Sequence, residues 1–203
     1  MVGDLGPVPG RLASNLQSVD VVVTPPAAAT ACPQTYTVQA YLTPLRQSIG
    51  NVAEVSLLGT RTNANWVNTG LALVLPDPGE YLITGDIRTN ICATVDDLGA
   101  TNLWTTVRLL HVQSGAVELG GNRIGAQHQF SSAPGTQFQT CQSGTAPLTG
   151  LVRVTAAQAT KTVRVQAKLN GGGPNFGLTG GSTIQTSIFD GANSQLTYVK
   201  IAD

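Results

Sequence analysis

The chain has 203 residues, with 11 Lys and Arg residues against 11 Asp and Glu residues and a formal net charge of zero. Only 11% of the residues are charged and 5% are aromatic, which argues against a protein that binds nucleic acid or an anionic membrane through its general charge. A surface so poor in charge is typical of a protein whose faces are covered in an oligomer or an assembly.

The chain begins with a segment that favours neither a helix nor a central strand. Gly3, Gly6, Pro7, Pro9 and Gly10 fall within its first ten residues, and these residues break regular structure. The same ten residues lack the basic and apolar regions of a signal peptide, and no later run reaches the roughly 18 apolar residues of a membrane span. We therefore expect a soluble protein with an extended N-terminal arm over residues 1–50, which contains short strands at 19–23 and 35–42.

The segment Asn65–Arg88 holds two stretches of alternating apolar residues. Leucines recur at every second position over Leu71–Leu75, and a second alternation covers Tyr81–Ile87. The turn-forming Pro76–Gly79 separates them. This pattern predicts two strands joined as a β-hairpin.

Further strands follow at short intervals, separated by turn residues and without a convincing helix. They are expected at residues 90–95, 103–112, 116–119, 122–131, 137–141, 151–155, 162–169, 183–189 and 195–201. About eight to ten strands with this spacing predict a two-sheet sandwich or barrel, of which the jelly roll is the commonest closed form. The predicted organisation is an all-β jelly-roll β-sandwich head over residues 51–203, preceded by the arm.

Three segments carry a family resemblance. They are WVNTGLALVLPDPGEYLITGDIR from Trp66 to Arg88, TVRVQA from Thr162 to Ala167, and LTYVKIA from Leu196 to Ala202. These segments look like the jelly-roll domains, similar to tumour-necrosis-factor and C1q domains, of tailed-bacteriophage virion proteins. The resemblance covers about residues 59–203, and it is a pattern of strands and turns with no catalytic signature.

The resemblance implies a homotrimer and a non-enzymatic structural protein at the surface of a phage virion, made in the host cytoplasm. It implies a capsid decoration or head-fibre protein that binds the major capsid protein. The alternative is a tail-fibre or tail-tip module that binds a host receptor or surface glycan, with a tail protein as its virion partner. In either case the arm would be the attachment element, with these candidate contact residues: Leu5, Pro7, Val8, Pro9, Arg11 and Leu12.

The residues that could carry metal or redox chemistry are few and far apart. His111 and His128 are the only histidines, and neither has another metal ligand at a short fixed spacing. The three cysteines are most simply buried thiols, although the spacing leaves a bond between Cys92 and Cys141 open. We therefore expect no metal and no cofactor.

Three other motifs are most simply structural. Asp96–Asp97 precedes Leu98-Gly99 and predicts a turn in place of a carboxylate pair. Ser131–Ser132 lacks the glycines of a nucleophile elbow, and Gly177–Thr183 lacks the lysine of a phosphate-binding loop. We therefore expect no catalytic residue.

Trp66, beside Asn65 at the start of a predicted strand, is the candidate for sugar binding. An indole ring can stack on the apolar face of a sugar while a neighbouring amide bonds its hydroxyl groups. The competing interpretation is a tryptophan packed at the head of a core strand, which is the commoner case.

Overall fold

The computed structural model describes residues 18–20, 39–41, 46–60, 65–112, 116–155, 157 and 161–202, and for 18–20, 39–41 and 116–118 it describes the backbone. Of the predicted arm, β1 (Ser18–Asp20) and β2 (Gln39–Tyr41) lie within this set and pair antiparallel. The predicted attachment residues between Leu5 and Leu12 lie outside the described residues. The arm therefore stays a prediction.

The remaining elements are strands and one short 3-10 helix, in agreement with the predicted all-β class. In chain order they are β3 (Arg46–Gly50), β4 (Val55–Ser56), η1 (Leu58–Thr60), β5 (Val67–Leu75), β6 (Gly79–Val95), β7 (Ala100–Val112), β8 (Ala116–Ser131), β9 (Phe138–Val154), β10 (Lys161–Gly171), β11 (Leu178–Thr179), β12 (Thr183–Phe189) and β13 (Gln195–Ala202).

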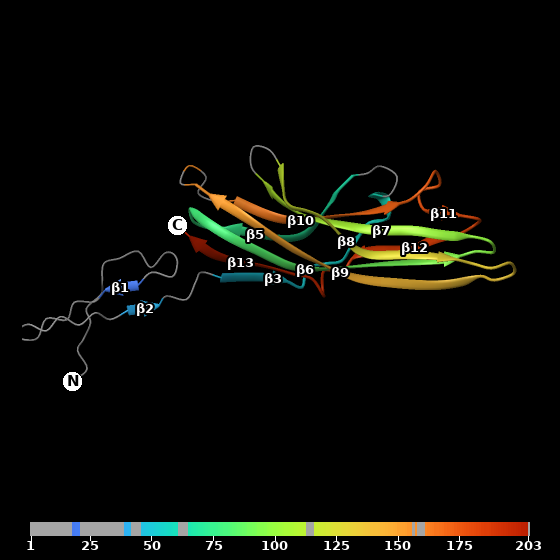
Figure 1. Cartoon of the computed structure of the whole chain (residues 1–203), viewed down its shortest axis with the longest axis horizontal. Helices are drawn as coiled ribbons and strands as arrows, with labels where there is room; N and C mark the ends of the chain where they lie inside the picture. Colours follow the sequence, from blue (N-terminus) through green and yellow to red (C-terminus); the bar gives the residue numbers. More distant parts are fainter. Residues whose placement is uncertain are drawn as a thin grey trace, which may run out of the picture.

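The pairing of these strands is nested, and it defines the fold. Strand β7 pairs with β8, β6 with β9, β5 with β10, and β3 with β13, all antiparallel. One sheet contains β8, β7, β10 and β5, and the other contains β9, β6, β13 and β3, with the shorter β11, β12 and β4 extending them. Figure 1 shows the long strands running along the head in two layers. The predicted jelly-roll sandwich is confirmed.

Alternation along each strand places one set of side chains between the sheets. In β6 the odd-numbered residues from Gly79 to Val95 are buried and the even-numbered ones are partly or fully exposed. In β10, which covers the strand predicted at 162–169, every second side chain is buried: Val163, Val165, Ala167 and Leu169. Because each strand contributes one apolar face, the core is a single layer of interdigitated side chains between the two sheets.

The predicted hairpin at Asn65–Arg88 is wrong, although both of its strands exist. Strand β5 pairs with β10, whereas β6 pairs with β9, β12 and β13 in the other sheet. The turn after Leu75 thus carries the chain from one layer to the other. Both strands have a buried apolar face, and two such faces can be covered by packing against each other across the sandwich. Alternation of apolar residues shows that one face of a strand is buried. It does not show which other strand is hydrogen-bonded to it.

Three strands are each continuous where the sequence predicts two: β6, β9 and β8, the last of which joins the predicted strands at 116–119 and 122–131. Strand β6 runs without interruption through the predicted break near residue 88, and β9 includes Gly144, Pro147 and Gly150. The proline is compatible with the strand because β9 lies at an edge of its sheet, where a missing N–H group leaves no ladder bond unmade. Conversely, β12 and β13 both pair with β6 at successive stretches, so they form one interrupted strand and not a hairpin.

A buried polar contact joins the two sheets inside the core. The hydroxyl oxygens of Thr89 on β6 and Thr105 on β7 are 2.6 Å apart, and the backbone N–H of Ala126 donates to both at 2.8 Å. The pairing of β7 with β8 shifts register here, and a bulge of this kind frees a backbone donor. A Cβ at Gly125 would lie 2.3 Å from the Thr89 hydroxyl. The missing side chain therefore allows this close contact.

The predicted boundary between arm and head, at residues 50 and 51, stays a prediction. Strand β3, just before that boundary, pairs with β13 and forms part of a head sheet. Ser48 on β3 lies 2.7 Å from Thr197 between their hydroxyl oxygens. These contacts place residues 46–50 with the sandwich.

Candidate functional site

Trp66 lies at the start of β5 on the outer face of the β8–β7–β10–β5 sheet, where it is partly buried. The guanidinium carbon of Arg108 lies 4.0 Å from the centre of its ring, and the ammonium nitrogen of Lys168 lies 4.8 Å from it. Both distances are those of cation–π interactions. The ring is therefore a platform for two cations, while the neighbouring Asn65 is exposed.

Hydrogen bonds across three strands fix the position of Arg108. Its Nε and Nη2 atoms donate to the Oε1 atom of Gln166 at 2.9 and 2.8 Å. The Gln166 Nε2 atom in turn donates to the Oδ1 atom of Asn68 at 2.8 Å. The three residues are opposite one another in the register of β7, β10 and β5. The guanidinium group is thus held over the indole ring by the sheet itself.

The same face carries two further cationic side chains with few partners. Alternation along β10 places Arg164, Gln166 and Lys168 outward. The Nε atom of Arg164 is buried without a hydrogen-bond partner among the described residues. Glu118 of β8 is opposite Leu110, and Leu110 is opposite Arg164, so one residue with a carboxylate lies on this face two strands from Arg164. We call this surface the cationic face, defined by Trp66, Asn68, Arg108, Arg164, Gln166 and Lys168.

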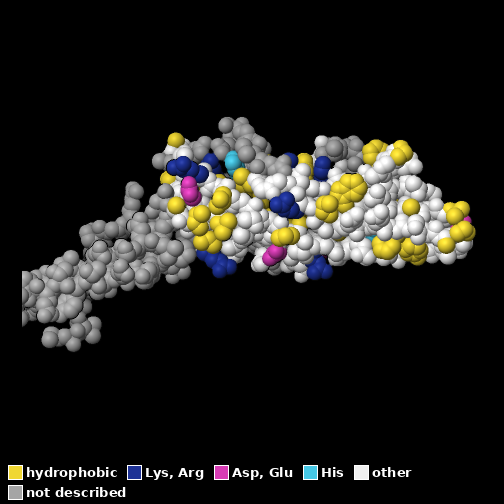
Figure 2. Space-filling view, viewed as in Figure 1, with side chains coloured by type: hydrophobic (Ala, Val, Ile, Leu, Met, Phe, Trp, Pro, Cys, Tyr) yellow, Lys and Arg dark blue, Asp and Glu magenta, His cyan; other side chains and the backbone are white. Residues whose placement is uncertain are grey.

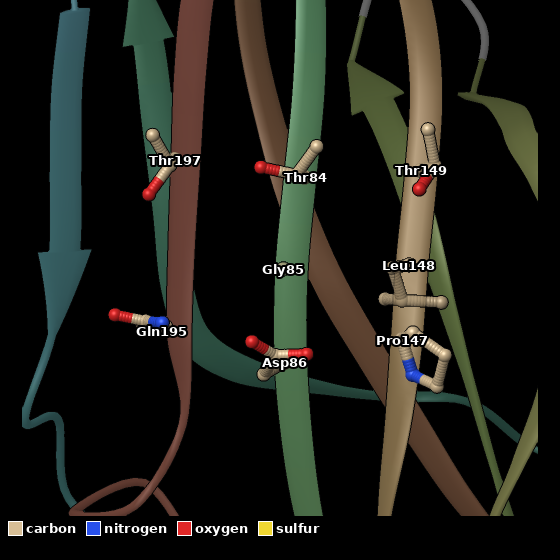
Figure 3. Close-up of a pocket in the computed structure, with 8 residues that line it drawn as sticks. All are labelled: Thr84, Gly85, Asp86, Pro147, Leu148, Thr149, Gln195 and Thr197. Atoms are coloured by element: carbon tan, nitrogen blue, oxygen red, sulfur yellow. The ribbon is translucent and has the colours of Figure 1, made fainter.

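The outer face of the second sheet is different in character. Figure 3 shows a shallow hollow across β13, β6 and β9, with hydroxyl groups of three threonines along one side. The hollow has a volume of about 140 Å³ and is lined by Thr84, Gly85, Asp86, Pro147, Leu148, Thr149, Gln195 and Thr197. Thr84, Asp86, Thr149 and Gln195 are polar and exposed, Pro147 is apolar and exposed, and the other three lining residues are buried. The hollow contains one carboxylate and no aromatic ring, so it has no platform for stacking.

The histidines lie inside the sandwich, away from both outer faces. The Nδ1 atom of His128 lies 2.7 Å from the Thr101 hydroxyl, and its Nε2 atom lies 3.2 Å from the carbonyl oxygen of Thr140. Burial lowers the pKa of His128, and the backbone contact with Thr140 partly offsets this. Burial also lowers the pKa of His111, with a smaller contribution from the nearby charge of Lys161. Both imidazoles are buried between the sheets.

The other motifs also have structural roles. The predicted turn at Asp96–Gly99 is confirmed, because the Gly99 N–H donates to the Asp96 carbonyl oxygen at 2.7 Å. The carboxylate of Asp97 accepts from the backbone N–H of Gly135 at 2.6 Å, and the Ser132 hydroxyl donates to the Asp96 carbonyl oxygen. In the described part of the chain, no three His, Cys, Asp or Glu residues are placed to hold a metal ion.

Cys92 and Cys141 form a disulfide bond with sulfur atoms 2.02 Å apart. They are directly opposite each other on β6 and β9, on the outer face of their sheet. The preferred interpretation of buried thiols is therefore wrong for these two residues, and the alternative that the spacing left open is correct. Cys32 lies outside the described residues. Among the described residues, no helix is long and apolar enough to cross a bilayer.

Comparison with known proteins yields no matching family model and no matching curated protein. Among solved structures, the chain is similar to Eiger TNF from S. frugiperda, with 15% identity and a TM-score of 0.36, over 79% of this chain and 95% of that one. It is also similar to a chain of the infectious bursal disease virus Gx strain, with 11% identity and a TM-score of 0.32, over 92% of this chain and 42% of the viral one.

A third similar structure is the infectious bursal disease virus VP2 subviral particle, with 10% identity and a TM-score of 0.34. That match covers 94% of this chain and 45% of the VP2 chain, so this chain spans less than half the length of these viral proteins. At such low identities and scores, these likenesses assign no function.

The sequence could identify Trp66 but not the residues around it. The alternation in Thr162–Leu169 already placed Arg164 and Lys168 on one face. However, Arg108 reaches the ring only through the pairing of β7 with β10, and that pairing joins segments far apart in the chain. The hollow beside Asp86 has no sequence signal, because it arises where three strands meet.

Proposed function

We propose that the protein is a non-enzymatic structural protein of a phage virion, a homotrimeric capsid decoration protein attached through its N-terminal arm. The observation that carries the proposal is the outer face of the β9–β6–β13–β3 sheet, which we call the association face. It has the composition expected of a surface that packs against copies of itself. The family resemblance of the sequence supplies the virion context.

The association face has an apolar row and a hydroxyl row at its centre, while Glu80, Asp86, Arg88 and Arg153 lie in the rows on either side. Val199, Leu82 and Leu151 form an apolar row on neighbouring strands, with Arg46 of β3 opposite Val199 at its end, and Leu151 is 67% exposed. The next row carries hydroxyl groups only, from these residues: Ser48, Thr197, Thr84 and Thr149. Figure 2 shows how thinly Lys, Arg, Asp and Glu side chains are spread over the visible side of the head.

The energetics favour closure by several contacts at once. Burial of apolar area contributes about 25 cal/mol per Å², while association costs several kcal/mol of lost freedom before any net affinity appears. A flat row of three aliphatic side chains does not overcome that cost in a single contact. A closed ring of three identical contacts overcomes the cost of association more readily. Repeated docking of trimers on a shell adds avidity.

The disulfide between Cys92 and Cys141 also supports a place on the outside of a particle. Disulfides persist in oxidising surroundings and at virion surfaces, and they are rare in cytosolic proteins. The bond lies on the outer face of its sheet, where an oxidant has access after the chain leaves the cell.

Light scattering of the purified chain tests the trimer. The expected mass is about three times the chain mass of 21.0 kDa. Leu151→Arg should weaken association at least tenfold, because it removes an exposed leucine that the contact between subunits would bury and adds a charge there. Leu98→Arg is the matched control, since Leu98 is also 67% exposed but lies in the Asp96–Gly99 turn. A monomeric parent protein, or equal effects of the two variants, would contradict the proposal.

Deletion of residues 1–42 tests the attachment role of the arm. The truncated chain should remain a trimer but should no longer bind purified capsids. Capsid binding that survives the deletion would exclude the arm as the attachment element.

A second candidate function is a receptor- or glycan-binding tail module, which the partly exposed Trp66 beside Asn65 favours. Binding to a glycan array that is lost in Trp66→Ala, together with no binding to capsids, would support this candidate over decoration.

A further inference from the structure

We propose that the cationic face binds an acidic polysaccharide, whose carboxylate, sulfate or phosphate groups pair with Arg164 and Lys168. The inference extends the glycan-binding candidate by naming the charge of the ligand. It concerns a different face from the proposed trimer contact, so each can fail without the other.

The first argument is the local charge. The chain as a whole is neutral, yet three cations lie on this face against one carboxylate residue, Glu118, two strands from Arg164 in the register. The neighbouring rows of the sheet contain Arg164, then Arg108 beside Gln166, then Lys168. Four residues along a strand span roughly 13 Å, which suits successive charged groups of an extended chain. The repulsion between like charges held so close falls when an anion binds between them.

The second argument is the number of donors left without acceptors. Lys168 makes no hydrogen bond or ion pair with a described residue beyond its contact with the Trp66 ring. Arg164 has a buried Nε atom with no described partner. The Nε atom itself is closed to solvent, so an external carboxylate or sulfate would pair with the terminal nitrogens of Arg164 and with the ammonium group of Lys168.

The third argument separates a saccharide from other anions. Amide groups lie between the cations, and Asn68 is exposed while its Oδ1 atom accepts from Gln166. Its Nδ2 group therefore stays available to a hydroxyl oxygen. Amides, a ring and a few cations on one flat surface match a ligand with many hydroxyl groups and sparse charge. The low overall basic content does not match the dense charge of nucleic acid.

The arrangement also changes the role expected for Trp66. With Arg108 over one part of its surface, the ring holds the guanidinium group in place instead of stacking broadly on a sugar. Replacing the ring with alanine should therefore weaken binding through loss of cation position. Phenylalanine keeps a ring face for the cations, so Trp66→Phe should restore part of the affinity.

Biolayer interferometry on the full-length chain tests the proposal, with heparin and polygalacturonate as acidic probes, dextran as the neutral probe and single-stranded DNA as the non-saccharide polyanion. Heparin or polygalacturonate should bind, and dextran should not. Lys168→Gln should weaken binding about three- to fivefold, and Arg164→Gln/Lys168→Gln should weaken it at least tenfold. Binding should fall as salt rises from about 0.05 to 0.3 M, because screening shortens the range of the charges.

Arg153→Gln is the matched control, since it removes one positive charge and leaves the cationic face intact; because Arg153 lies on the association face, light scattering must show that the variant has the oligomeric state of the parent. It should leave binding unchanged. If the double glutamine variant does not fold, Arg164→Lys/Lys168→Arg keeps both charges and should keep binding within about twofold. Undiminished binding by a folded double glutamine variant, equal binding of dextran, or tighter binding of single-stranded DNA than of either acidic polysaccharide would overturn the proposal, as would failure of both acidic polysaccharides to bind.

Discussion

Removing the disulfide between Cys92 and Cys141 should lower the stability of the head by an amount that the structure allows us to estimate. The two residues are 49 apart in the chain. The loop-closure entropy for a loop of that length corresponds to about 4 kcal/mol at 25 °C. Both side chains lie on the outer face of the sheet, so Cys92→Ser/Cys141→Ser leaves no cavity in the core. Its effect should therefore reflect the lost cross-link.

Urea unfolding of the parent chain and the double serine variant, each with and without a phosphine reductant, measures this difference. The parent should lose about 4 kcal/mol on reduction, equivalent to a fall in Tm of roughly 8–16 °C for a chain of this size. The double variant should match the reduced parent and should not respond to reductant. If the double variant unfolds within about 1 kcal/mol of the oxidised parent, residual pairing of β6 with β9 in the unfolded chain already limits its entropy, and the estimate fails.

Three further predictions concern the core. Gly125→Ala should lower the free energy of unfolding by about 1–3 kcal/mol, because a Cβ there would meet the hydroxyls of Thr89 and Thr105; urea denaturation measures it, and a neutral effect would contradict the close contact. Leu103→Ala should cost about 2–5 kcal/mol in the same assay, since this side chain is fully buried, and a smaller loss would show that the sheets close over the gap. Stability should fall as the pH drops below 6.5, the usual pKa of histidine. The unfolded chain then binds a proton that buried His128, with its lowered pKa, does not. Unfolding at pH 7.5, 6.5 and 5.5 tests this, and His128→Asn should reduce the slope.

The strands were predictable because burial of one face leaves a direct trace in the sequence. The alternation of Thr162–Leu169 survives intact in β10. The partners of the strands were not predictable from it, because alternation is the same whether an apolar face packs on the next strand's sheet or on the opposite one. Strand β9 was found only at its ends, since Pro147 and its neighbouring glycines are breakers except at a sheet edge.

The candidate site shows the same division. Trp66 was recognisable as an unusual residue in a chain with few aromatics. Its cationic neighbours depend on the register of β5, β10 and β7, which is set by packing over the whole sandwich. The association face likewise depends on which residues meet across strands, such as Thr84 and Thr149. The composition of a single strand does not indicate which residues will be opposite it on the neighbouring strands.

The outermost pair of the nested strands has a practical consequence for engineering. Arg46, at the start of β3, is opposite Val199 near the end of β13. The first strand of the head therefore begins, and its last strand ends, at the same end of the sandwich, which we call one pole. Strand β6 runs from that pole through 17 residues, roughly 55 Å, and the exposed Ala133–Gly135 loop lies beyond its far end (Figure 1). A peptide fused after β13 would lie beside the point where β3 enters the sheet, whereas one inserted in this loop would be presented at the opposite end of the head.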